Sequence, residues 1–429
     1  MGRDEKPRDR AVAGGSGTIG DALKKLRRPR PPSKRQAERL LSGEAWDDLC
    51  HELEAAGKKI LTFNPGASGL ERAAGFRYLA GLVNAALRFS IDFADPSVPR
   101  FFRSPDSRTQ WGGENADNQY LIAAIASDRA YRLSGSRGSA FDFLIEVKEG
   151  FMQLGDDRVF ETVAASDLEL ALDASFEIVL SAERPAGHTG PWIPIHPEAK
   201  LIVIRQYFWD WEHEEPARFR IECIGNEGRA PAPMTAERVG EVVTDAADWI
   251  EASVRVWNQW VERIRADHRP GQVVAAIKLV GGADTIRYGN DYYHLEPGEA
   301  LIVESEIPDA RYWEFQLCGL WFEGRDYTNR ETSINGHQAH IDPDLRFRCV
   351  IAHEDPGVAN WLDAAGHVEG LLQYRWVWTK NCPQPTCRTV ELADVRSHLP
   401  ADTPTVTPQQ RRRRVVVRQR HMTRREPWC

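Results

Sequence analysis

Hydrophobic residues recur at helical spacing in two long stretches of the N-terminal half. The first runs from Ser68 to Phe89, with apolar side chains at every third or fourth position. Ser68 and Glu71 form the pattern of a capping box, which predicts that a helix begins there. The second runs from Thr235 to about residue 267 and predicts one long helix spanning a lobe. Two shorter amphipathic helices are predicted within residues 35–57.

Short segments bounded by turn residues predict β-strands elsewhere. In the first half, strands are expected at 119–126, 129–133, 140–148, 175–182, 200–208 and 217–224. The first three of these, with a Gly/Ser turn at 134–139, predict a meander. After residue 271, strands are expected at 272–280, 292–295, 300–306, 311–317, 337–341, 346–353 and 371–378. Turns this short favour antiparallel pairing, and many short strands favour a sandwich or jelly roll.

Chain length favours two packed lobes, because 429 residues exceed the size at which one hydrophobic core usually stops growing. We therefore predict an α+β protein. An antiparallel, jelly-roll-like β-sandwich would form its C-terminal domain, and antiparallel strands and helices, including the long helix, would form its N-terminal lobe. The predicted parts are a disordered basic leader at 1–34, the N-terminal lobe at 35–270, the C-terminal sandwich at 271–400 and a disordered Arg-rich tail at 401–429.

The net charge of −8 combines basic ends with an acidic body. Residues 1–35 contain 11 Lys and Arg against 4 acidic residues, and residues 410–429 contain 8 Arg against one Glu. The remainder holds 36 basic and 58 acidic residues, a formal charge of −22. An acidic body argues against nucleic-acid binding by the folded part. The Pro content of the two tails and their lack of apolar periodicity favour disorder. Alternatively, the run from Arg411 to Arg414 contacts the protein's own acidic surface.

Composition and motifs argue against several classes of protein. The seven cysteines are scattered without a Cys-x-x-Cys pair, so neither a disulfide framework nor a zinc site is expected. No apolar run is long enough for a signal peptide or a membrane span, which favours the cytoplasm. No nucleotide-binding glycine motif and no nucleophile elbow occurs. We expect no cofactor; the expected partner is a small-molecule ligand, and the oligomeric state is not indicated.

Several motifs between residues 309 and 378 resemble those of a bacterial family. They are Asp309-Ala310-Arg311-Tyr312-Trp313, Tyr327-Thr328-Asn329, Ser333-Ile334-Asn335 with Gln338, the Asp342 turn leading to Phe347-Arg348, Asp355-Pro356-Gly357-Val358-Ala359-Asn360-Trp361-Leu362-Asp363, and Gly370 leading to Arg375. This segment is similar to the family called domain of unknown function 1214. The rest of the chain that is expected to be ordered resembles the family only loosely. The resemblance implies a C-terminal β-sandwich after a helix-containing lobe and implies little chemistry. Leu345 departs from the family where a turn glycine is common, and the basic tails also depart from it.

The loop from His353 to His367 is rich in titratable and amide side chains. A histidine beside carboxylates, such as Asp355, can act as a general acid or base, and loops on a rigid sandwich often carry function. Asn and Asp in such loops also close turns, which is the alternative. A metal site is disfavoured, because His337 and His340 would lie on opposite strand faces and His353 roughly 20 Å beyond His340.

Alternation predicts polar faces on two strands of the sandwich. Glu314 lies on one of these faces and Arg375 on the other. If the polar faces converge, Glu314 and Arg375 must pair or meet a ligand, because an isolated buried charge is costly. The alternative is a sheet that faces solvent. In the other lobe, the polar segment 114–120 either lines a cleft with Trp111 or forms an Asx-rich turn.

These residues support a leading hypothesis and two alternatives. The leading one is an enzyme that uses general acid/base chemistry, hydrolysis or elimination, on a small, weakly polar organic molecule in a cleft between the lobes. The predicted catalytic residues are His353, His367, Asp355 and Glu314, and the predicted substrate-binding residues are Asn360, Trp361, Arg375, Trp313, Gln338 and Asn335. The first alternative is a non-catalytic protein whose Trp313, Trp361 and Trp376 stack on a sugar or aromatic ring. The second is an interaction protein whose tails bind polyanions.

Overall fold

The computed structural model describes residues 19–26, 31–64, 66–172, 174–267, 270–279 and 281–427. Most of the predicted disordered leader lies outside these residues, as do parts of the predicted helix stop near 268 and of the predicted strand ending at 280. Within the leader, Ile19–Lys24 forms a short helix, α1.

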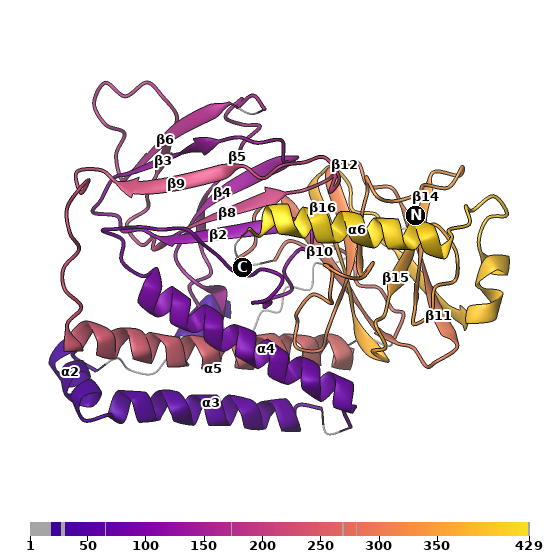
Figure 1. The fold of residues 1–429 in the computed structure, drawn as a ribbon, viewed down its shortest axis with the longest axis horizontal. Coiled ribbons are helices and arrows are strands. Elements are labelled where there is room, and N and C mark those ends of the chain that lie inside the picture. Colours follow the sequence, from indigo (N-terminus) through magenta and orange to yellow (C-terminus); the bar gives the residue numbers. More distant parts are fainter. Residues whose placement is uncertain are drawn as a thin grey trace, which may run out of the picture.

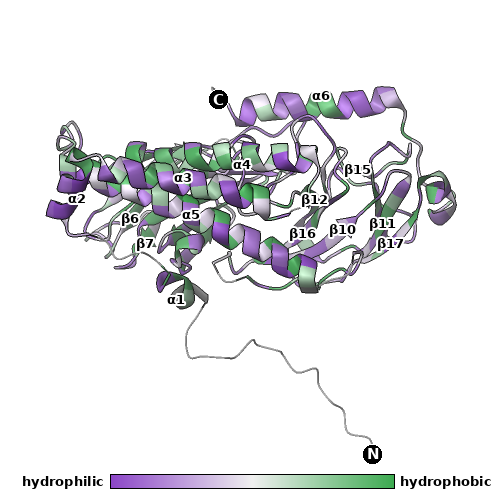
Figure 2. Ribbon diagram, turned by 90° about the horizontal axis from the view of Figure 1, so that it is seen from below, coloured by the Kyte–Doolittle hydropathy of each residue, from purple (hydrophilic) through white to green (hydrophobic). Residues whose placement is uncertain are grey.

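Four helices form a layer along the N-terminal lobe. They are α2 (Ser33–Leu41), α3 (Glu44–Thr62), α4 (Gly69–Leu87) and α5 (Ala236–Asp267). Helices α3, α4 and α5 lie side by side (Figures 1 and 2). The predicted long helix is confirmed, and Ser68 caps α4 by accepting a hydrogen bond from the Glu71 backbone N–H at 3.2 Å. A π-helical turn, Arg88–Asp92, follows α4 directly.

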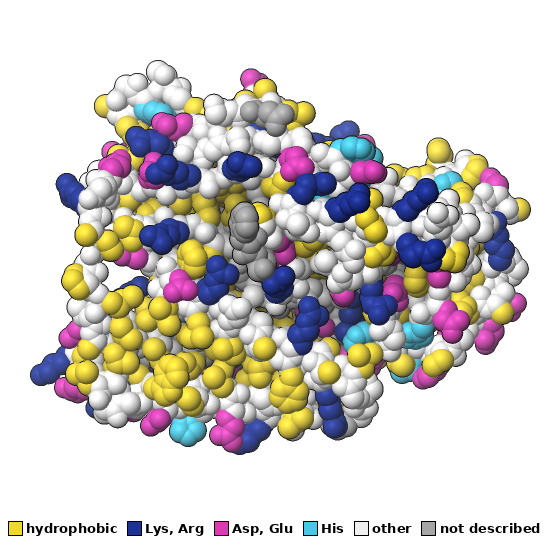
Figure 3. All heavy atoms as spheres, in the orientation of Figure 1, with side chains coloured by type: hydrophobic (Ala, Val, Ile, Leu, Met, Phe, Trp, Pro, Cys, Tyr) yellow, Lys and Arg dark blue, Asp and Glu magenta, His cyan; other side chains and the backbone are white. Residues whose placement is uncertain are grey.

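The outer side of the helical layer is unusually apolar. Figure 3 shows hydrophobic side chains gathered over the part of the surface where α4 lies, and Leu70 and Phe76 are 46% and 45% exposed. Helix α4 also buries Tyr78 and Leu82 in the core, so it is apolar on opposite faces. Among the described helices, none is both long enough and apolar enough to cross a membrane.

Two sheets of the N-terminal lobe pack against each other through one hydrophobic core. The first has the order β1-β2-β8-β4-β5, with bounds Phe102–Arg103, Asn118–Ala124, Leu201–Tyr207, Asp142–Lys148 and Val159–Ala164. The second has the order β7-β6-β3-β9, with bounds Trp192–Pro194, Ser175–Ser181, Tyr131–Ser136 and Arg218–Cys223. Phe143, Ile145 and Val147 of β4 lie in the shared core. Glu146 and Lys148 therefore face the other way, because side chains alternate along a strand.

The predicted meander is wrong. Strands β2 and β4 each pair with β8, whereas β3 belongs to the second sheet, between β6 and β9. The segment predicted as a Gly/Ser turn continues β3 as far as Ser136. The reason is burial: Leu133 is 0% exposed in the core between the sheets, so packing across the lobe decides the partners of β3 rather than local turn residues.

Two further sheets form the C-terminal half. The first has the order β10-β16-β12-β13, with bounds Ile286–His294, Glu369–Thr379, Ala310–Cys318 and Ser333–Asn335. The second has the order β15-β14-β11-β17, with bounds Trp361–Asp363, Arg346–Ala352, Glu299–Glu306 and Thr386–Glu391. Phe315 and Trp376 from the first sheet share a core with Val303 and Ile351 from the second. The protein is therefore a mixed α+β fold with several, largely antiparallel sheets, and the jelly-roll order stays a prediction.

Some predicted strands differ from the observed ones. Residues 337–341 form no strand, and only Ile341 makes a single bridge, to Phe347. Residues 272–279 run as an irregular segment with one bridge at Ile277. The short strands β13, β15 and β17 were not predicted, because three to six residues in loop-like sequence give little alternation.

The turn at residues 342–345 places Leu345 in a conformation that favours glycine. The Leu345 N–H donates to Asp342 O at 2.9 Å, and Leu345 has φ 61° with a side chain that is 75% exposed. Left-handed backbone costs a non-glycine residue about 1 kcal/mol. We expect Leu345→Gly to raise the free energy of unfolding by about 0.5–1 kcal/mol in chemical denaturation. Leu345→Ala keeps the strained conformation, so an equal gain in that variant would contradict the explanation.

The prediction of a disordered Arg-rich tail is wrong, because Pro408–Arg425 forms helix α6, which begins with a capping box between Thr407 and Gln410. Helix α6 lies across the junction of the lobes (Figure 1). Arg411, Arg418 and Arg425 recur every seventh position and are all buried, at 6%, 5% and 0% exposure. The alternative, contact with the acidic surface, is confirmed, because Arg411 pairs with Glu331 and Asp355. The helix escaped prediction because three of its five buried residues are arginines and only Met422 among the five is apolar.

Candidate functional site

The junction of the two lobes encloses a cavity of about 160 Å³. One wall is the face of β2, β8 and β4 opposite their core, and the other is the matching face of β10 and β16. Helix α5 and the loop before β2 contribute further lining. The lining residues are Pro105, Trp111, Gly112, Gly113, Glu114, Tyr120, Ile122, Lys148, Gly150, Phe151, Met152, Gln153, Leu201, Val203, Arg205, Trp257, Trp260, Leu279, Gly281, Gly282, Tyr288, Phe322, Gln373 and Arg375. Most of them are apolar or aromatic.

Three basic side chains line this cavity, and they have different partners. Arg205 Nε donates to Glu146 at 2.8 Å, and Arg375 pairs with Glu314. The Lys148 Nζ instead donates to the backbone oxygen of Gly281 at 3.0 Å. Two of the three cations are therefore matched by a carboxylate in direct contact.

Glu314 pairs with Arg375, which is one of the outcomes that the sequence left open. The two residues lie opposite each other on β12 and β16 and are 1% and 3% exposed, so the solvent-facing alternative is wrong. Their faces converge at the junction of the lobes rather than inside the sandwich. Arg375 also donates to Gly113 O, where φ is 60° and a Cβ would lie 2.7 Å from Gln373. Burial raises the pKa of Glu314 to about 7, although the Arg375 charge acts to lower it.

The polar segment 114–120 fulfils both of its predicted roles. Glu114 and Trp111 line the cavity, while the Asn115 side chain accepts from the Asp117 backbone at 2.7 Å in an Asx turn. Glu114 is 3% exposed and accepts hydrogen bonds from Gln110 Nε2 at 2.9 Å and Gly324 N at 3.1 Å. Burial raises the pKa of Glu114 to about 8. Its carboxyl group therefore holds a proton at neutral pH.

Glu114 should make stability depend on pH. Folding raises the pKa of Glu114 to about 8, so the folded protein keeps the carboxyl proton at pH values where the unfolded protein has lost it. The free energy of unfolding therefore falls as the pH increases towards 8. Glutamine cannot ionise. Between pH 5 and pH 8 we expect the free energy of unfolding of Glu114→Gln to increase by at least about 1 kcal/mol relative to that of the parent protein. Urea unfolding at both pH values measures this change. A difference between the two proteins that does not change with pH would contradict this assignment.

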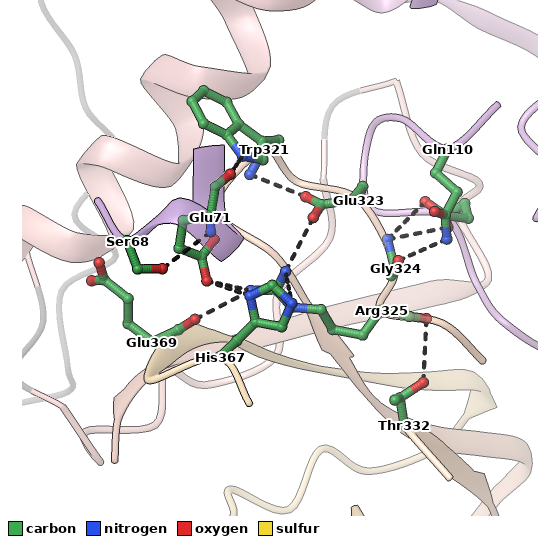
Figure 4. A network of polar contacts seen from close by, with 11 residues as sticks. Ser68, Glu71, Gln110, Trp321, Glu323, Gly324, Arg325, Thr332, His367 and Glu369 are labelled. Atoms are coloured by element: carbon green, nitrogen blue, oxygen red, sulfur yellow. Dashed lines mark hydrogen bonds and ion pairs between the residues drawn. The ribbon is translucent and has the colours of Figure 1, made fainter. Parts of the chain in front are cut away.

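His367 lies in a buried polar network that links α4 to the C-terminal half (Figure 4). Its Nδ1 contacts the Glu71 carboxylate, and its Nε2 lies 3.2 Å from Arg325, which also pairs with Glu323 at 3.4 Å. Burial lowers the pKa of His367, and the Arg325 charge lowers it further. Burial alone would raise the pKa of Glu71, but His367 and Arg325 bring it below the ordinary value. None of these four residues lines the cavity, so the network joins the lobes instead.

The other predicted catalytic residues are not brought together. His353 Nε2 lies 2.9 Å from the backbone oxygen of Leu295, at the end of the C-terminal sheets. Asp355 pairs with Arg411 of α6 at 2.9 Å. Of the predicted catalytic set, Glu314 contacts a residue that lines the cavity, whereas His353, Asp355 and His367 belong to three separate environments.

The predicted substrate-binding residues divide in the same way. Arg375 lines the cavity, but Trp313 is 5% exposed inside the C-terminal core together with Trp376. The predicted stacking surface with Trp361 is therefore not formed. Trp361 and Gln338 instead line a separate hollow of about 230 Å³ beside α6.

The amides of the two predicted binding asparagines bond to backbone groups, in a local turn for Asn335 and between distant segments for Asn360. Asn335 donates to Trp209 O at 3.1 Å and accepts from the backbone of His337 and Gln338. Asn360 donates to Arg348 O at 2.7 Å. Both amides are therefore occupied by backbone groups, and Asn360 joins the loop to residues 340 and 348 and closes no local turn.

Sequence reasoning missed three charged residues at the cavity: Glu146, Lys148 and Arg205. Alternation along 142–148 with Phe143, Ile145 and Val147 would have placed Glu146 and Lys148 on one face. In the part of the chain that the structure describes, no group of three or more His, Cys, Asp or Glu residues could hold a metal ion.

The fold and the cavity define a class, a two-lobed α+β protein whose candidate site lies between its lobes. The chain is similar to the crystal structure of an uncharacterized protein from Burkholderia cenocepacia, with 33% sequence identity and a TM-score of 0.78, over 83% of this chain and 99% of that chain. It belongs to the same family as that protein. The VPA0106 protein of Vibrio parahaemolyticus has 10% identity and a TM-score of 0.43 over 72% of this chain and 97% of its own, which is too low to support an inference. No family model and no curated protein matches the chain.

Proposed function

We propose that the protein binds a small organic anion in the cavity between its lobes. The observation that supports this is the presence of three basic side chains, Lys148, Arg205 and Arg375, in a largely apolar cavity where two have carboxylate partners. A buried charge without an ionic partner is costly, and a bound carboxylate would remove that cost. Glu114 adds no negative charge at neutral pH, because its pKa is about 8.

The size and the other walls of the cavity define the rest of the ligand. A volume of about 160 Å³ suits one ring or a short branched chain. Trp257 and Trp260 add aromatic surface to the wall of the cavity, which suits an apolar or aromatic part of a ligand. The proposal replaces the weakly polar ligand of the sequence hypothesis with an anionic one and keeps its location between the lobes.

Acid/base catalysis at the same cavity is a second candidate function, and Glu114 favours it. A carboxyl group with a pKa of about 8 can donate a proton at neutral pH. Glu114 would then take the role that the sequence hypothesis gave to His353 and His367. Recovery of a bound ligand with its structure changed would distinguish this enzyme, a hydrolase or lyase, from a non-catalytic binding protein.

We also propose that residues 309–378 belong to domain of unknown function 1214, and that the C-terminal sheets form its jelly-roll-like sandwich. The shared core of Phe315, Trp376 and Ile351 supports a sandwich. An alignment of homologues tests the assignment, and it would fail if the Asn360-Trp361-Leu362 motif were absent from that family.

Calorimetric titration with benzoate and benzamide tests the anion site. The two molecules have similar shape and differ in charge, so we expect benzoate to bind at least tenfold more tightly. The double variant Glu146→Gln/Arg205→Met removes one ion pair without leaving a lone charge, and it should weaken benzoate binding by about tenfold. Arg412→Met, at an exposed position on α6, is the control and should bind normally. Equal affinities for benzoate and benzamide would contradict the proposal.

A further inference from the structure

We infer that Lys148 is a nucleophile that forms an imine with the carbonyl group of a 2-oxo acid. The inference rests on the proposed anion site and specifies its ligand: a carboxylate next to a ketone, with a short apolar or aromatic substituent.

The backbone aims Lys148 at the cavity. Lys148 is the last residue of β4 and follows Val147, which lies in the core on the other side of the sheet. The pairing of β4 with β5 shifts register between these two residues, so that Val147 lies opposite Glu161 and Lys148 opposite Val159. The extra residue, Phe160, lies on β5, whereas β4 stays in register with β8, so ordinary alternation along β4 carries the Lys148 side chain to the face opposite Val147. Lys148 is 8% exposed and lines the cavity.

The amine of Lys148 is held without an ionic partner. Its 3.0 Å hydrogen bond to Gly281 O uses one of three donors, and no carboxylate among the described residues lies within ion-pair distance. Nearby lysines differ, because Lys24 pairs with Glu149 at 2.5 Å and Lys200 pairs with Asp156 at 3.1 Å. Burial lowers the pKa of Lys148 against the opposing charges of Glu146 and Asp157, and the Arg205 charge lowers it as well. Both effects increase the fraction of neutral amine, which is the nucleophilic form.

The second requirement is a group that holds the substrate beside this amine. Leu201 of β8 lies opposite Lys148 of β4. Arg205 follows Leu201 by four positions, so its side chain points to the same face of the sheet as that of Lys148. Arg375 reaches the cavity from the opposite wall. A carboxylate bound by these arginines would place the adjacent ketone within the same small cavity as the lysine.

The reaction balances with groups that the site contains. The nitrogen lone pair attacks the ketone carbon, and the carbonyl oxygen takes up a proton to give a carbinolamine. The carbon–oxygen bond then breaks, and the oxygen leaves as water with the two hydrogens that the amine supplied. Glu114 lines the cavity and is protonated at neutral pH, so it can protonate the departing hydroxyl group and take a nitrogen proton in return. The product is an imine between Lys148 and the oxo acid.

Reductive trapping tests the inference. Benzoylformate would be incubated with the full chain and sodium cyanoborohydride, which reduces an imine to a stable secondary amine, and the product analysed by intact mass and peptide mapping. We expect one adduct, located on Lys148. Lys148→Arg should lose at least nine-tenths of the labelling, whereas Lys200→Arg, at a lysine that directly precedes β8 and has an ionic partner, should retain it. Equal labelling of the parent protein and Lys148→Arg would overturn the inference.

Mandelate separates failure of this inference from failure of the proposed function, because it has the carboxylate and ring of benzoylformate but no ketone. If both compounds bind in calorimetry and no adduct forms on Lys148, the inference is overturned and the anion site remains. If neither compound binds, the anion site fails and the inference with it. Lys148→Arg keeps the positive charge, so continued mandelate binding by this variant would show that lost labelling is a loss of the nucleophile and not of the fold.

Discussion

Replacing Arg375 by methionine is expected to lower the free energy of unfolding by about 3–5 kcal/mol. The Glu314 carboxylate, 1% exposed, would lose its ionic partner, and Gly113 O and Gln373 would lose a donor. The pair also connects a C-terminal sheet to the loop that precedes β2, so its loss weakens the junction as well as one strand. Urea unfolding followed by tryptophan fluorescence measures the change.

Two further variants test whether the cost comes from the unpaired charge. The double variant Glu314→Gln/Arg375→Met removes both charges. Its free energy of unfolding should fall by less than that of Arg375→Met alone. Lys380→Met, directly after the same strand, breaks a pair with Asp309 in which both side chains are exposed, at 81% and 63%, and it should cost less than about 1 kcal/mol. If the double variant were as unstable as the single one, packing rather than charge would be the cause.

Replacing Arg411 by alanine should cost about 3 kcal/mol, because it leaves Glu331, itself buried, short of its main ionic partner. The adjacent Arg412 and Arg413 are exposed, so alanine at either position should change stability by less than about 0.5 kcal/mol. The comparison holds the helix, the residue type and the lost charge constant. Similar effects at all three positions in thermal or urea unfolding would contradict the burial explanation.

Patterns within one segment predicted much of the fold. The apolar stripe of 235–267 gave α5, and alternation along 311–318 and 371–378 gave the buried faces of β12 and β16. The same alternation placed Glu314 and Arg375 on polar faces but left open whether they pair, meet a ligand or face solvent, because burial of those faces depends on how the lobes pack. The long helix and the alternation of the strands depend on local periodicity, which a sequence displays directly.

The sequence suggested a cleft between the lobes, but most of the residues that line it could not be predicted because the lining depends on strand order. Lys148 and Arg205 share a wall only because β8 lies between β2 and β4, and the sequence suggested a meander instead. Glu71 shows the same limit. Its position in a capping box was visible, but its carboxylate binds His367, which lies 296 positions later in the chain. No local pattern encodes a partner at that distance.

Helix α6 has a consequence for how the protein is made. It fastens both lobes, since Arg425 donates to Ala116 O at 2.8 Å in one and Arg411 pairs with Asp355 in the other. Both lobes precede α6 in the chain, so a ribosome completes them before it releases the segment that joins them. During synthesis the lobes can collapse separately, with the acidic surface around Glu331 still uncovered. The contacts between the lobes that α6 supplies can therefore form only after both lobes have been synthesised.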